Sequence, residues 1–398
     1  MGQHDVSEPR DGEDRRRFVK RLIDDVHALD QMIQDDVFET GTHRIGAEQE
    51  MFLADNSGRP LCAALEVLDA IDDSHFTTEL ALFNLELNLD PLDFSRDCLG
   101  QIERDLTRRL RQAEVAAGKC GAHIVLTGIL PSLRKSDMAV DNMTPLPRYA
   151  ALNHSANLLR GGPRHFRITG VDELNLTHDS VMLESCNASF QVHYQVSPHD
   201  FVPLYNASQA FAAPLLAAAA NSPLLFGHRL WQETRIALFE QAVDTRRTGT
   251  DRRFHPRVQF GQQWLRGSVV ELYREDISRF RTLMSNVDDE DPFACLRRGE
   301  LPRLLALRLH TGTVWRWNRA CYGVLDGKAH LRIENRVLPS GPTVADEVAS
   351  AALWLGLMAA EEADPTRFAS VMEFESAKEN FIAAARHGLS GQFEWIGG

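Results

Sequence analysis

The sequence predicts an α+β fold whose central sheet has an apolar back and a polar front. Four stretches alternate apolar residues with polar residues of the kinds found in catalytic sites, at a period of two. They are residues 44–52, 82–89, 189–196 and 331–337. In a β-strand, residues two apart point to the same face of the sheet. Helical stretches separate these strands and no linker divides the chain, so we expect one domain over residues 14–398 behind a disordered tail at 1–13.

Most of the expected helices follow from apolar residues at helical spacing and from glycine and proline at their ends. In chain order they span 14–37, 62–72, 96–118, 146–160, 198–221 and 228–243. Thr343 is a candidate N-cap for a further helix that runs to about Glu362.

The expected strands include the four striped ones, at 43–53, 82–90, 186–197 and 330–338. A short buried strand is expected at 123–128, and another strand-like run at 164–176. Two segments have the composition of loops, the basic one at 244–263, which could be mobile, and the acidic one at 283–300.

Composition and charge exclude several broad classes of protein. The net charge of −13 argues against a general nucleic-acid binder, which needs a basic surface. Six scattered cysteines with no CxxC pair predict reduced thiols. The polar N-terminus and the shortness of the longest apolar stretch, 210–220, predict a cytoplasmic protein that does not enter a membrane. The sequence leaves open whether the chain forms a homo-oligomer.

Three glutamates in the first two striped strands are candidate metal ligands. Glu48 and Glu50 share one strand face, and Glu86 lies between two leucines in a very apolar strand. A buried, isolated carboxylate is costly unless it is paired or coordinated. Carboxylate oxygens suit Mg²⁺ or Mn²⁺. The plainer interpretation of the first pair is a solvated strand face. Glu79 is a weaker candidate.

The other two striped strands supply a histidine and a charged row. His193 is either a structural histidine or a ligand. In the last strand Glu334 lies between Arg332 and Arg336. The three residues form either a structural row of ion pairs or a metal ligand flanked by arginines that hold phosphate or carboxylate. Arg319, just upstream, could add another such arginine. The chain has no Walker A, GxGxxG, HExxH or GxSxG motif.

Taken in order, these motifs resemble the glutamate–cysteine ligase family. The motifs are Gly46-x-Glu48-x-Glu50, Leu85-Glu86-Leu87, Gln191-x-His193 and Glu334-x-Arg336, within residues 43–362. The resemblance is closest to the bacterial carboxylate–amine ligases that are similar to γ-glutamylcysteine synthetase. It implies a fold like the catalytic domain of glutamine synthetase, a curved, mainly antiparallel sheet with helices on its convex side. The concave face would bind ATP and two or three Mg²⁺ (or Mn²⁺) ions.

The resemblance also implies roles for individual residues. The metal ligands would be Glu48, Glu50, Glu86, His193 and Glu334. Arg336, helped by Arg319, would hold the transferred phosphate or the substrate carboxylate, and Arg332, Gln191 and Arg336 would contact the nucleotide. The implied reaction joins a small-molecule acid to an amine through an acyl phosphate made from ATP.

Two other functions remain open from the sequence. One is a catalytically silent ligase paralogue that binds a nucleotide or amino acid as a regulatory subunit. The other is a phosphotransferase on the same fold. The segments 164–184 and 321–330 depart from better-known members of the family, so substrates other than glutamate and cysteine are plausible.

Overall fold

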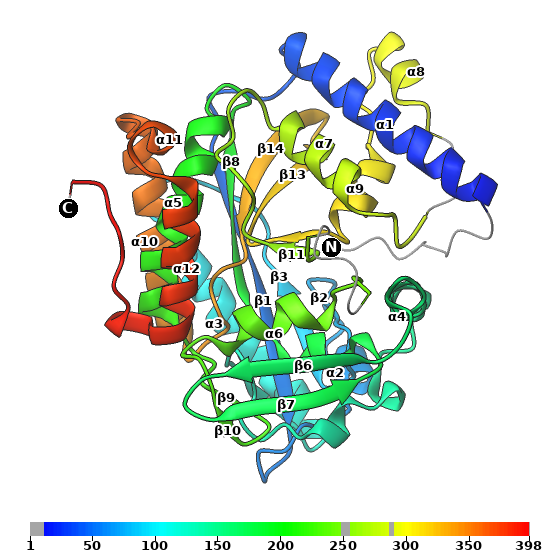
Figure 1. Ribbon diagram of the computed structural model, residues 1–398, viewed down its shortest axis with the longest axis vertical. Coiled ribbons are helices and arrows are strands. Elements are labelled where there is room, and N and C mark those ends of the chain that lie inside the picture. The colour runs from blue at the N-terminus through cyan, green and yellow to red at the C-terminus, as the bar shows by residue number, and fades with distance from the viewer. Residues whose placement is uncertain (1–11, 248–254, 286–289, 398) are drawn as a thin grey trace.

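An eight-stranded antiparallel sheet forms the centre of the protein in the computed structural model, which describes residues 12–247, 255–285 and 290–397 (Figure 1). Its strands are β1 (Arg44–Ala54), β2 (Phe76–Thr78), β3 (Asn84–Asn88), β4 (Leu92–Asp93), β5 (His123–Val125), β8 (Phe190–Val196), β13 (Asn318–Leu325) and β14 (Lys328–Asn335). The order is β13-β14-β8-β1-β3-β2, with β4 and β5 also paired to β1. The predicted α+β class and curled, antiparallel sheet are confirmed.

The four striped strands are neighbours in this sheet, and their register aligns the stripes. Glu50 on β1 lies opposite Glu86 on β3. His193 on β8 lies between Gly46 on β1 and Glu334 on β14. Because side chains alternate between the two faces, one register carries every polar stripe to the front and the intervening apolar residues to the back.

Helices cover the apolar back of the sheet. These are α3 (Cys98–Lys119), α5 (Phe201–Ala219) and α10 (Val344–Ala363), with α2 (Ala64–Ile71) against α3 and with α11 (Phe368–Val371) and α12 (Phe374–His387) against α5. Figure 1 shows α5, α10 and α12 side by side. The main apolar core joins them to back-facing residues of the sheet such as Met51, Tyr194 and Ile333.

Other segments border the polar front. They are α4 (Pro147–Arg160), the 3₁₀ helix η3 (Val181–Cys186), α7 (Val270–Arg279) and α9 (Leu305–Thr311). Outside them lie α1 (Gly12–Gln34), α6 (Thr234–Ala242), α8 (Pro292–Arg297), the hairpin β6 (Arg164–Thr169) and β7 (Glu173–His178), and the pairs β9 (Leu224–Leu225) with β10 (His228–Arg229) and β11 (Val258–Gln259) with β12 (Trp315–Arg316). Short 3₁₀ turns are η1 (Lys135–Met138), η2 (Val140–Asn142) and η4 (Gly388–Ser390). None of the helices in the described residues is both long and apolar enough to cross a bilayer.

Several predicted elements differ from the observed ones. The first helix begins at Gly12, and the rest of the expected tail, 1–11, lies outside the described residues. The strand expected to be buried at 123–128 ends at Val125 and is partly exposed, because it pairs only with the end of β1. The helix expected from 228 begins at Thr234.

The two expected loops also contain regular structure. The acidic segment holds α8, whose N-cap Asp291 accepts hydrogen bonds from the backbone N–H groups of Phe293 and Ala294. The basic segment holds β11, and its residues 248–254 lie outside the described residues. The N-cap assigned to Thr343 is confirmed, since its hydroxyl accepts from the Asp346 N–H at 3.3 Å.

The unusual segment 321–330 forms most of a tight hairpin between β13 and β14. Leu325 pairs with Lys328, which leaves only Asp326 and Gly327 in the turn. Both have positive φ, 50° and 72°, as a two-residue type I′ turn requires. The segment therefore extends the sheet beside the site and does not form a separate insertion.

Trp354 on α10 is a good test of the core behind the sheet. Its side chain is fully buried, and its indole N–H donates to Ser208 Oγ at 3.2 Å. We expect Trp354→Ala to lower the free energy of unfolding by about 3–5 kcal/mol, through lost burial and an unfilled cavity. The neighbouring Leu353, 43% exposed, provides the matched control, and Leu353→Ala should cost about 0.5 kcal/mol or less. Urea unfolding followed by circular dichroism measures both; equal losses would contradict this account of the core.

Asp25 makes stability depend on pH. Burial raises the pKa of this carboxyl to about 7, repulsion from Glu290 adds to the rise, and hydrogen bonding from the Leu307 N–H at 3.0 Å opposes it. The folded protein therefore holds a proton that the unfolded chain has lost, so stability falls as pH rises towards 7. We expect wild type to lose about 2–3 kcal/mol between about pH 5 and about pH 8 from this group.

Asp25→Asn should remove that part of the pH dependence, because the amide oxygen still accepts from Leu307 and has no charge to bury. Urea midpoints across the pH range measure the effect. The exposed Asp141 supplies the control, since it is not among the groups that shift the pKa of Asp25 and Asp141→Asn should leave this slope in place. An unaltered slope in Asp25→Asn would contradict the assignment.

Candidate active site

Two clusters of candidate metal ligands lie side by side on the polar front of the sheet. The mixed triad consists of Glu48, His193 and Glu334, and the carboxylate triad consists of Glu50, Glu79 and Glu86. Within each triad, one ligand atom from every residue lies within 4.8 Å of the others. The fold thus brings together all five residues expected as ligands and adds Glu79.

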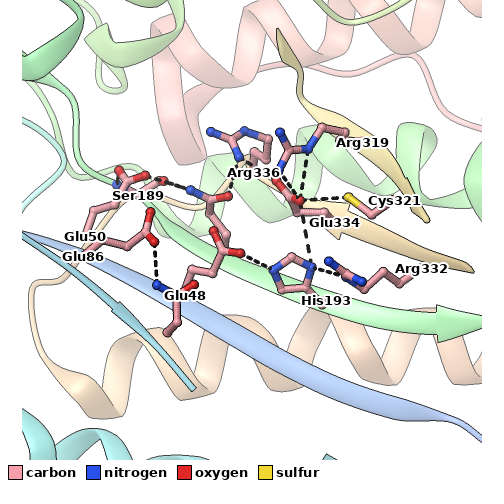
Figure 2. Close-up of polar contacts among 12 residues, drawn as sticks. Glu48, Glu50, Glu86, Ser189, His193, Arg319, Cys321, Arg332, Glu334 and Arg336 are labelled. Carbon is pink, nitrogen blue, oxygen red and sulfur yellow. Dashed lines mark hydrogen bonds and ion pairs between the residues drawn. The ribbon is translucent and has the colours of Figure 1, made fainter. Parts of the chain in front are cut away.

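Strand β1 supplies one residue to each triad. Glu48 and Glu50 are two apart, so both point to the front, and the cross-strand register gives them different neighbours. Figure 2 shows Glu48 directed to the imidazole of His193 and Glu50 lying beside Glu86. Two adjacent sites therefore arise from one alternating Glu-Gln-Glu segment.

Arginines balance the charge of the mixed triad. Arg319 Nη2 donates to Glu334 Oε2 at 2.7 Å, and Arg336 Nη1 donates to Glu334 Oε1 at 2.5 Å (Figure 2). Burial disfavours the charged form of Glu334, but the two guanidiniums outweigh it and hold the pKa of that carboxyl well below its usual range. Burial also disfavours the charged form of Glu48. The hydrogen bond and the charge of His193 outweigh it and lower the pKa of Glu48 to about 2. These carboxylates are ready to bind a cation without first losing a proton.

His193 is held from both sides. Its Nε2 lies 3.0 Å from Glu48 Oε1, and its Nδ1 accepts from Arg332 Nε at 3.2 Å. Cys321 on β13 donates its S–H to Glu334 Oε2 at 3.1 Å. A cation bound at this triad would compete with Cys321 and the arginines for the oxygens of Glu334.

The carboxylate triad has no such balance. No lysine or arginine among the described residues forms an ion pair with any of its three members. Burial and repulsion from Glu86 raise the pKa of Glu50 to about 7, although Arg336 opposes the rise. Burial, Glu86 and Glu50 raise the pKa of Glu79 well above its usual value. Three converging carboxyl groups of this kind must either hold protons or share a cation.

The donor set fits a hard divalent cation. The carboxylate triad offers only oxygen ligands, and the mixed triad offers two carboxylates and an imidazole. Mg²⁺ and Mn²⁺ prefer such ligands. A cation would also neutralise the mutual repulsion that raises the pKa values of Glu50 and Glu79.

Gln191 connects the two triads. Its Nε2 donates to Glu50 Oε1 at 2.7 Å, and its Oε1 accepts from Arg336 Nη1 at 2.5 Å. The backbone N–H of Ser189 donates to the other oxygen of Glu50 at 2.6 Å. The amide of Gln191 thereby connects a carboxylate of the carboxylate triad to the arginine that pairs with Glu334 of the mixed triad.

One cavity lies over both triads. Its wall includes Glu48, the whole carboxylate triad and the residues expected to act on the nucleotide or phosphate, namely Arg319, Arg332, Arg336 and Gln191. Arg308 on α9 lies on the same wall. His193 and Glu334 lie beneath it, 7% and 0% exposed. The cavity thus joins a cation-binding floor to a cluster of arginines suited to phosphate.

Sequence reasoning did not assign four of the cavity's charged residues to the site. Glu79 lies just after β2, outside any striped strand, and was only a weak candidate. Glu184 on η3, Arg148 on α4 and Arg308 on α9 were not assigned roles. None of them belongs to an alternating stripe, because they reach the front of the sheet from segments that connect its strands.

Comparison with known proteins identifies the family. The model of glutamate–cysteine ligase family 2 matches residues 44–396. A search of curated proteins found no match. Among solved structures, the chain is similar to glutamate–cysteine ligase from Francisella tularensis in complex with AMP, at 12% identity and a TM-score of 0.51 over 88% of this chain and 72% of that one.

A bifunctional glutathione synthetase from Pasteurella multocida is also similar, at 14% identity and a TM-score of 0.46 over 92% of this chain and 44% of that one. The family match extends from β1 through α12, over the whole sheet and the cavity above it. The protein therefore belongs to glutamate–cysteine ligase family 2 and is an ATP-dependent ligase that forms carbon–nitrogen bonds.

Proposed function

We propose that the protein activates a small-molecule carboxylic acid with ATP as an acyl phosphate and transfers the acyl group to an amine. The observation that carries this proposal is the pair of adjacent triads, one charge-balanced by arginines and one not, beneath a single cavity. Such a reaction needs groups that hold phosphate and offset charge, and it needs no protein nucleophile.

In this proposal the two triads hold Mg²⁺ or Mn²⁺. Divalent cations held there would supply positive charge that offsets the negative charge developing during phosphoryl transfer. The ligands would be Glu48, His193 and Glu334 in one site and Glu50, Glu79 and Glu86 in the other.

The arginines position the transferring group. Arg319 and Arg336 reach the mixed triad from β13 and from the end of β14, so their guanidiniums lie where a phosphate oxygen would approach. Arg332 orients His193 by donating a hydrogen bond to its Nδ1. Gln191 holds Arg336 near Glu50 by hydrogen bonding to both. These contacts fix the geometry before substrates bind and reduce the cost of reorganisation during the reaction.

The complete set of ligands favours an enzyme over a silent, regulatory paralogue. A nucleotide-binding subunit without activity would have no need for three clustered carboxylates that repel one another when charged. The retained repulsion is a cost that binding a catalytic cation would relieve.

The carboxylate triad supplies the first test. We expect Glu50→Gln and Glu79→Gln each to reduce Mg·ATP-dependent turnover by at least about 100-fold, because each removes a charged ligand. Chelation of divalent cations with EDTA should abolish turnover in wild type. Measurements of ADP release and of thermal stability separate lost chemistry from lost folding. Glu103→Gln on exposed α3 surface is the control and should keep wild-type rates. Full activity in Glu79→Gln would contradict its place in the site.

Isotope transfer tests the acyl phosphate. The protein is first screened with amino acids, other acids and amines for ADP formation that depends on both substrates. The acid is then supplied with ¹⁸O in its carboxylate, and we expect one labelled oxygen in the released phosphate and an amide by mass spectrometry. Unlabelled phosphate would contradict the acyl-phosphate step. A phosphorylated acid formed whatever the amine would indicate a phosphotransferase, and no ADP with any pair would favour the silent paralogue.

A further inference from the structure

One part of the cavity wall contains two opposite charges that do not pair. Glu184 comes from η3 and Arg148 from the first turn of α4. The Glu184 carboxylate forms no hydrogen bond or ion pair with any described residue. The Arg148 guanidinium lies 5.1 Å from the ring centroid of Tyr149 and forms no ion pair within the described part of the chain. Both side chains are available to a ligand in the cavity.

The described residues provide no hydrogen-bond donor for the carboxyl group of Glu184, so a ligand would have to provide one. Val181, Leu152 and Tyr149 line the same cavity and offer little to a carboxylate. Burial and repulsion from Glu50 raise the pKa of Glu184 to about 8, and Arg336 and Arg148 offset this only in part. A half-buried carboxyl group without a donor is costly, and a bound cation with N–H groups would remove that cost.

The chemistry of the wall selects the kind of cation. Glu184 belongs to neither triad, so its carboxylate is not placed with the other candidate ligands of a metal ion. The phosphates of a nucleotide suit the arginines near the mixed triad, and a phosphate beside Glu184 would further oppose the ionisation of its carboxyl group, whereas a cation there would favour it. An ammonium group carries one positive charge and several N–H donors, which match a single carboxylate.

We infer that Glu184 is a specificity-determining residue that binds the ammonium group of a substrate. This inference rests on the proposed ligase function and names the chemistry that one of its substrates presents. Two sources share that chemistry, namely the amine that receives the acyl group and an amino group carried by the acid. Arg148, on the same wall, would complement a carboxylate on the same molecule or on the second one.

Kinetics of Glu184→Gln distinguish the sources. The variant keeps the size of the side chain and removes its charge. KM is measured separately for Mg·ATP, for the acid and for the amine, using the pair found in the screen, and again with hydroxylamine, which is uncharged near neutral pH, as the acceptor. If Glu184 binds the amine, KM for the amine should rise at least about tenfold while turnover with hydroxylamine stays near wild type. If it binds the acid, KM for the acid should rise with either acceptor.

Two further variants serve as controls for this interpretation. Glu184→Asp keeps the charge and should recover part of the lost affinity, and Glu103→Gln should behave as wild type. KM for Mg·ATP should change by less than about twofold in all of them. Unchanged KM values for both acid and amine in Glu184→Gln would overturn the inference while leaving the ligase function intact. A wild type that makes neither amide nor hydroxamate would instead contradict the proposed function itself.

Discussion

The antiparallel register across β3, β1, β8 and β14 is the constraint on which the site depends. It sets Glu50 opposite Glu86, and it sets His193 opposite Glu334. A slip of one residue in any of these pairings would turn a polar stripe into the core and an apolar stripe into the cavity. The apolar back, packed under α3, α5 and α10, opposes such a slip, so the same burial that stabilises the sheet aligns the candidate ligands.

The register creates two neighbouring sites with opposite electrostatics. In the mixed triad, arginines compensate for burial and keep Glu334 ionised. In the carboxylate triad, mutual repulsion adds to burial and favours protons. Gln191 bridges them through hydrogen bonds to Glu50 and Arg336. This difference is consistent with a site in which one cation would bind among pre-formed charges and the other would replace protons.

The walls of the cavity have a different origin from its floor. The floor is made of strand residues at a period of two, whereas α4, η3, α7 and α9 supply the walls. Membership of glutamate–cysteine ligase family 2 is consistent with the reaction class that the floor supports. In our proposal substrate choice depends on the walls, where Glu184 and Arg148 form no ion pair with any residue that the structure describes.

The sequence by itself determined the strand residues that form the floor of the cavity. Alternation identified the four strands, their polar faces and the candidate ligands Glu48, Glu50, Glu86, His193 and Glu334, because a period of two is a local property of an extended chain. It also identified Thr343 as an N-cap, since capping involves residues three apart.

Only the tertiary structure decided the rest. Glu79 completes the carboxylate triad and Glu184 and Arg148 join the wall through packing of segments far apart in the chain, which leaves no periodic signal. The short helix α8 and the exposed edge strand β5 were misjudged because capping and sheet position outweigh composition there. Strand faces can be recognised locally, but the partners that set charge, pKa and specificity are chosen by the fold.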